Sequence, residues 1–174
     1  TNIHYSLLES SIVKEEYKTK QATIFINKIV SIAQPYGYSE VKREFDLFEG
    51  ANQIGDIDLI LKDCNNNYIL IEAKNHALPL DVYFKDLIKT KAHLSYLQKK
   101  WEAKVIKRVE HLKINHDRYS IPVTYQYIVV SRFPEIISHY SELLVLSTSE
   151  FTHWLKKERL SNNFDEIIND FYQL

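Results

Sequence analysis

The sequence predicts an α/β fold in which helices flank both faces of a mixed sheet of four to five strands. Two observations predict it: a hairpin of two apolar strands around a short polar turn, and a long amphipathic helix that separates this hairpin from two further apolar strands. An antiparallel hairpin that leads through a helix into more strands requires a mixed sheet covered on both faces. The 174 residues suffice for a single domain with its own core.

The first half of the chain predicts a helix and then three strands. Apolar residues recur at helical intervals over residues 5–34, with a break expected at 17–19, and a Pro-Tyr-Gly sequence ends this region. Polar and apolar residues alternate over 41–48, which indicates the first strand. Residues 49–53 are expected to form a loop before the second strand.

The second and third strands form the hairpin, on either side of a cluster of Asn and Asp residues centred on Asn65. With the turn centred there, Asp58 lies opposite Glu72, and Asp56 lies opposite Lys74. Side chains alternate faces along a strand, so these four charged groups are expected to share one face. The other face receives the apolar residues of both strands: Ile57, Leu59, Leu61, Ile69, Ile71 and Ala73.

The second half predicts helices and strands in alternation. A long helix, or two helices, covers about 81–113, and residues 123–131 and 143–147 form two further strands. Helices are expected over 150–158 and 164–172. The apolar stripe of the long helix comprises Leu87, Leu94, Leu97, Trp101, Val105, Val109 and Leu112.

The charged face of the hairpin suggests a chemical role. Like charges in direct opposition, as predicted for Asp58 and Glu72, are destabilising unless a cation neutralises them. Mg²⁺ or Mn²⁺ bound by these oxygens can polarise a phosphodiester and lower the pKa of a bound water. Lys74 can orient that water and stabilise the charge that develops on phosphorus. The alternative is a surface hairpin whose charges form a solvated ion-pair cluster.

These residues resemble a known family. Gly-Asp-Ile-Asp-Leu-Ile, a turn, and then Ile-Leu-Ile-Glu-Ala-Lys-Asn is similar to the PD-(D/E)xK, or restriction-endonuclease-like, nuclease superfamily, especially its Holliday-junction-resolvase-like and NERD-type branches. The resemblance covers residues 40–75 well and the rest only in topology. It implies an αβββαβ core and a Mg²⁺- or Mn²⁺-dependent endonuclease in which Asp58 and Glu72 bind metal and Lys74 is the catalytic lysine. It favours DNA over RNA as the nucleic acid, and places Asp56 at a secondary acidic position.

The superfamily often adds a glutamate from the helix before the sheet. Glu16 is the first candidate and Glu44, on the strand before the hairpin, is another. Gln21 occupies the stretch where several relatives place this residue, so the number of bound metals stays open. The alternative for Glu16 is a solvated helix face. Asn75 and His76 follow the catalytic lysine as supporting residues; His76 either contacts phosphate or metal-bound water, or faces solvent at the strand end.

A local excess of basic residues follows the hairpin. Those expected to contact the nucleic-acid backbone are Lys85, Lys89, Lys99, Lys100, Lys104, Lys107 and Arg108. Such contacts make binding dependent on salt. The alternative is that these residues form the solvated face of the long helix. Tyr83, Tyr96 and Trp101 either stack on splayed bases or belong to the core, as aromatic residues at helical spacing more often do.

Composition limits the classes of function. The net charge of −1 and the pI of 6.6 argue against a large non-specific footprint on nucleic acid. Cys64 is the single cysteine, which excludes a disulfide framework and a cysteine-rich zinc site and predicts a reducing, cytoplasmic location. No apolar run approaches the ~18–20 residues that span a membrane. The start at Thr1 and the absence of Met predict a piece of a longer polypeptide.

Two hypotheses follow for the function. The first is a metal-dependent nuclease, working as a homodimer or beside other domains of a larger protein. The second is a nucleic-acid-binding or assembly module that keeps the nuclease fold without activity, within a larger restriction or defence protein.

Overall fold

The computed structural model describes residues 11–75, 82, 84 and 86–156. The predicted helix over 164–172 and the predicted helix starts at residues 5 and 81 lie outside these residues. The elements in chain order are α2 (Ser11–Ala33), η1 (Gln34–Tyr36), β1 (Ser39–Glu49), β2 (Asn52–Lys62), β3 (Tyr68–Lys74), α4 (Leu87–Tyr96), η2 (Leu97–Glu102), α5 (Ala103–Asn115), η3 (His116–Tyr119), β4 (Gln126–Ser131), η4 (Ile136–His139), β5 (Leu144–Ser147) and α6 (Thr148–Leu155).

The five strands form one mixed sheet in the order β1-β2-β3-β4-β5. β1, β2 and β3 pair antiparallel, whereas β3, β4 and β5 pair parallel. The parallel pairing is possible because the helical segment from α4 to α5 carries the chain from the end of β3 back to the start of β4. The predicted α/β class with a mixed sheet is confirmed.

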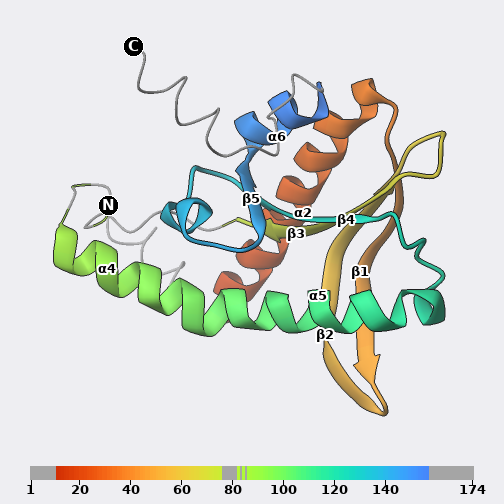
Figure 1. Cartoon of the computed structure of the whole chain (residues 1–174). Coiled ribbons are helices and arrows are strands. Elements are labelled where there is room, and N and C mark those ends of the chain that lie inside the picture. Colours follow the sequence, from red (N-terminus) through yellow and green to blue (C-terminus); the bar gives the residue numbers. More distant parts are fainter. Residues whose placement is uncertain (1–10, 76–81, 83, 85, 157–174) are drawn as a thin grey trace.

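Helices cover both faces of the sheet (Figure 1). α2 and α6 pack on one face, where Ile29 and Phe151 join Leu59 in a buried apolar cluster. α5 packs on the other face, where Leu112 joins Leu70 in a second cluster. Among the described residues, no helix is both long enough and apolar enough to cross a membrane.

Several element bounds differ from the sequence prediction. α2 continues through residues 17–19 without a break, although these residues are exposed and the packed part of the helix begins at Phe25. Extension of a helix that has already formed is favourable, so these residues stay helical. The expected loop over 49–53 shrinks to a tight turn around Gly50, whose φ of +64° suits glycine. Leu87, expected on the apolar stripe, is 73% exposed because α4 begins there, capped by Asp86.

The predicted register of the β2–β3 hairpin is confirmed over its paired part. Leu59 pairs with Ile71 and Leu61 with Ile69, as expected for a turn centred on Asn65. Asp63 shapes this turn, since its carboxylate accepts hydrogen bonds from the Asn65 and Asn67 amides. The strand pairing ends at Leu59 and Ile71, one position short of Asp58 and Glu72.

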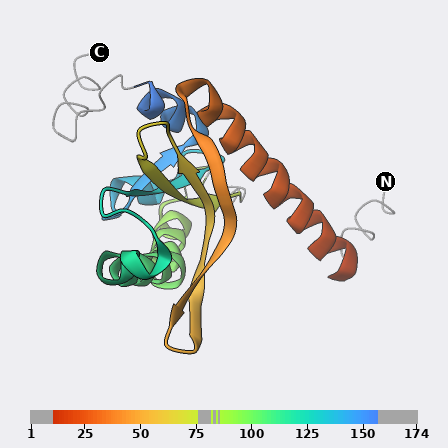
Figure 2. The ribbon, with the colours of Figure 1, turned by 90° about the vertical axis from the view of Figure 1, so that its right-hand side faces the viewer.

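The prediction that Ile57 shares a face with Leu59 is wrong. Leu59 packs under α2, whereas Ile57 packs with Ile60 on the α5 side. The β1–β2 ladder steps over Glu44 and Asp58, and Glu44 has a φ of +47°. Both strands change faces here, so the distal half of the β1–β2 hairpin turns away and projects past α5 (Figure 2).

The long helix is one continuous helical segment with a π-helical turn inside it. In η2 the amide of Ala103 reaches back to the carbonyl of Gln98. π turns are rare and often occur at functional sites. This turn places Trp101 against the end of β3, as described below.

Candidate active site

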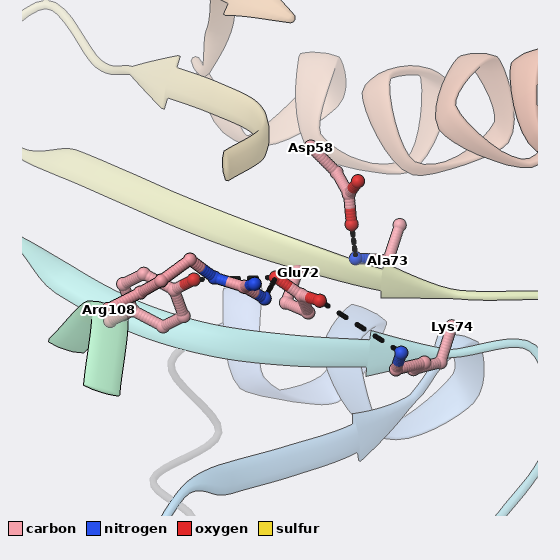
Figure 3. Close-up of polar contacts among 6 residues, drawn as sticks. Asp58, Glu72, Ala73, Lys74 and Arg108 are labelled. Carbon is pink, nitrogen blue, oxygen red and sulfur yellow. Dashed lines mark hydrogen bonds and ion pairs between the residues drawn. The ribbon is translucent and has the colours of Figure 1, made fainter. Parts of the chain in front are cut away.

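The two carboxylates of the predicted motif lie where β2 and β3 separate. Asp58 is half-buried in β2 and Glu72 is buried in β3. Beyond the last strand pair, the Ala73 amide donates a 2.6 Å hydrogen bond to Oδ2 of Asp58 (Figure 3). The Asp58 side chain thereby satisfies a backbone donor that strand pairing leaves free.

Glu72 lies at the centre of a buried polar network. Its Oε2 accepts a 2.6 Å hydrogen bond from Nη2 of Arg108 and a 3.4 Å bond from the Tyr127 hydroxyl. Its Oε1 lies 4.0 Å from Nζ of Lys74. Figure 3 shows this carboxylate turned towards Arg108 and Lys74, while Asp58 points at the β3 backbone. The charged groups predicted to share one face therefore do not point to one place: Glu72 faces Arg108 and Lys74, and Asp58 faces the β3 backbone.

Asp58 resists ionisation. Burial and the negative charge of Glu72 raise the pKa of its carboxyl to about 7, against the opposing effect of the Ala73 hydrogen bond. A cation beside both carboxylates would offset the repulsion from Glu72, which is the second cause of this shift after burial.

Lys74 is held against an aromatic ring. Its Nζ lies 4.7 Å from the centre of the Trp101 ring, and both residues line a narrow hollow with buried Glu135. Burial lowers the pKa of Lys74, although Glu72 and Asp58 oppose the shift. An ammonium with a lowered pKa gives up its proton more readily near neutral pH.

The donors fit a hard divalent cation, but only two are gathered. Asp58 and Glu72 supply carboxylate oxygens, which Mg²⁺ and Mn²⁺ prefer and which water can complete. Glu16 is exposed on α2, and Glu44 is exposed where β1 changes faces. Among the described residues, no group of three or more His, Cys, Asp or Glu side chains is placed to hold a metal ion.

Known proteins give no match to this chain. Comparisons with models of protein families, with curated proteins and with solved structures each found nothing similar.

The residues predicted to support the site make contacts elsewhere. Asp56 pairs with Asp46 of β1, and the β2–β3 ladder ends at Leu59 and Ile71, before Asp56 and Lys74. Asn75 donates its side-chain amide to the backbone carbonyl of Gln21, which ties the end of β3 to α2. His76 and Lys85 lie outside the described residues.

The basic residues divide into two groups. The exposed lysines of the helical segment are Lys89, Lys99, Lys100, Lys104 and Lys107. Arg108 was expected to contact phosphate. In the structure it is 8% exposed and hydrogen-bonded to Glu72. It faces the sheet two helical turns beyond Trp101.

Sequence reasoning missed two contributors to the site, Tyr127 of β4 and Glu135 of the loop after it. Trp101 packs against a buried apolar cluster, as the core alternative predicted, and its ring also contacts Lys74. A signal for Arg108 existed in Gly55, because a glycine inside a strand often marks a close approach of another group.

Proposed function

We propose that this chain is a metal-dependent nuclease of the PD-(D/E)xK kind that hydrolyses phosphodiester bonds, in DNA by preference. One observation carries the proposal: where the pairing of β2 and β3 ends, the negative charge of Glu72 helps to raise the pKa of Asp58, and Lys74 lies 4.0 Å from Glu72.

Each residue has a role in this proposal. Asp58 and Glu72 hold a divalent cation, which would supply Lewis-acid polarisation of a phosphodiester oxygen. Lys74 orients the attacking water and stabilises negative charge on the phosphate. Trp101 holds the Lys74 ammonium against its ring and so fixes its position beside Glu72.

Cleavage of plasmid and single-stranded DNA with Mg²⁺ or Mn²⁺ tests the proposal. Asp58→Asn, Glu72→Gln and Lys74→Met should each lower the rate about 10²-fold or more, because each removes a group that contacts the reacting phosphate or its cation. Lys89→Met removes the same charge from an exposed site on α4 and serves as the control. Equal cleavage by wild type and the three site variants would exclude this assignment.

A binding or assembly module without activity is the second candidate. The observation that favours it is the Arg108 bond, which occupies one oxygen of Glu72 at 2.6 Å. Titration calorimetry with Mn²⁺ separates the two functions. A nuclease should show binding heat that Glu72→Gln abolishes, whereas the module should show no heat that depends on Glu72.

A further inference from the structure

Arg108 is a buried cation in contact with the proposed active site. Its side chain is 10% exposed, and its Nη2 donates a 2.6 Å hydrogen bond to Oε2 of Glu72 (Figure 3). Its buried Nε has no acceptor among the described residues. The Glu72 carboxylate is therefore the main counter-charge of this guanidinium.

β2 is shaped to admit the Arg108 side chain. A Cβ added at Gly55 would lie 2.7 Å from Nη1 and 2.9 Å from Cδ of Arg108, which is closer than such atoms approach. The φ of Gly55 is +132°, a conformation that side chains other than glycine rarely adopt. The bare backbone of Gly55 thus gives Arg108 the room to reach Glu72.

Arg108 and a divalent cation would compete for Glu72. Like charges repel strongly in a site with little water, so a nearby guanidinium weakens the binding of a second cation. Without a bound cation, the same guanidinium neutralises Glu72, which would otherwise be a buried unpaired charge.

We propose that Arg108 is an internal counter-ion of Glu72 that replaces the divalent cation when none is bound and weakens its binding. This inference rests on the proposed function, because Asp58 and Glu72 must hold the cation. Arg108 is then a positioning residue, and the site fills only at a higher free cation concentration than its carboxylates alone require.

Arg108→Met tests the inference with two measurements that do not depend on cleavage. By calorimetry, the Kd for Mn²⁺ should fall about ten-fold or more, because the competing charge is gone. In EDTA, the melting temperature should fall by roughly 6 °C or more, because Glu72 is left buried and unpaired.

Two further variants are matched controls. Lys107→Met removes the same charge from the same helix, but Lys107 is 60% exposed and pairs with Glu49 at 3.4 Å, so Mn²⁺ affinity should change less than about two-fold. Arg108→Met combined with Glu72→Gln should regain much of the lost melting temperature, because no charge is left unpaired.

The outcomes separate this inference from the proposed function. Tighter Mn²⁺ binding by Arg108→Met supports it, whether or not wild type binds measurably. Equal or weaker binding by the folded variant overturns it and leaves the nuclease proposal standing. Absence of Glu72-dependent binding in both proteins overturns both proposals. If Arg108→Met fails to fold in EDTA, rescue by Mn²⁺ or by Glu72→Gln supports the inference, and failure of both rescues contradicts it.

Discussion

The charge of Asp58 near neutral pH is set by its burial and by the neighbouring Glu72. Burial and Glu72 raise the pKa of its carboxyl to about 7, while the hydrogen bond from the Ala73 amide favours ionisation. The carboxyl is therefore partly protonated in the metal-free protein at neutral pH. Binding of a divalent cation requires the proton to leave.

The pH dependence of Mn²⁺ binding follows from this pKa. Below about 7, the affinity should fall about ten-fold per pH unit, because Asp58 must be ionised to bind. Between its ordinary value of 3.8 and about 7, the folded protein keeps a proton on Asp58 that the unfolded chain releases. The stability of the metal-free protein should therefore fall as pH rises through this range. Calorimetry and thermal melts at several pH values measure the two effects.

Asp58→Asn should remove the stability trend, whereas Asp117→Asn should leave it intact. Asp117 is the matched control because its side chain is 95% exposed. A Mn²⁺ affinity that stays constant across the acidic range would contradict the assignment of Asp58 as a ligand.

At the level of single residues, local sequence predicted the motif but not its counter-ion. Asp58, Glu72 and Lys74 follow from strand alternation around one short turn; in the structure Glu72 lies 4.0 Å from Lys74, while Asp58 points at the β3 backbone. Arg108 is distant in sequence and lies among exposed lysines. Its burial depends on packing of α5 against Gly55; a glycine inside a strand signals a close approach, but local sequence does not identify Arg108 as the approaching group.

The distal half of the β1–β2 hairpin is an element that two contacts hold against α5 and η3. Arg108 lies against Gly55 on β2, and the Tyr119 hydroxyl bonds both the amide and the carbonyl of Phe48 on β1. His111 supports the same hydroxyl at 2.9 Å. The position of this hairpin is thus coupled to the helix that carries Arg108.

Gly55→Ala should destabilise the protein by about 2–5 kcal/mol, because it adds backbone strain at a φ of +132° to a collision with Arg108. Gly50→Ala is the matched control. Gly50 also has a positive φ, +64°, but a Cβ there meets nothing within 4 Å, so a loss of about 1 kcal/mol is expected. Urea unfolding measures both variants, and equal losses would contradict the close approach of Arg108 to β2.

For nucleic-acid binding by the whole molecule, we expect the distribution of charge over the surface to matter more than the net charge. The chain is close to neutral at −1, yet exposed lysines gather along η2 and α5. Nucleic-acid binding through this surface should depend on salt in proportion to the number of phosphates it contacts.

Replacement of Lys99, Lys100 and Lys104 by Ala should reduce the slope of log affinity against log salt concentration by about 2–3. Fluorescence anisotropy with a labelled DNA in EDTA measures this slope without cleavage. Replacement of Lys18, Lys20 and Lys28 on α2 removes the same charge elsewhere and should leave the slope nearly unchanged. Equal reductions by both triple variants would show that only net charge matters.

The fold class was predictable because alternation and element order are local properties. The register of β2 and β3 followed from the turn around Asn65, and the structure confirms it over the paired residues. The change of faces at Glu44 and Asp58 was not predictable, because strict alternation assigns Ile57 to the wrong side. The reversal depends on how β1 and β2 together pack against two helices on opposite faces.

The π turn in η2 has a consequence for insertions and deletions. A π turn uses more residues than an α turn, so removal of one residue from 97–102 would allow a regular α-helix to form. Everything before the deletion would rotate by about 100° relative to α5. If Glu102 is the residue removed, Arg108 would keep its place on Glu72, whereas Trp101 would rotate away from Lys74. The length of this segment is therefore as much a part of the site as the identity of its side chains.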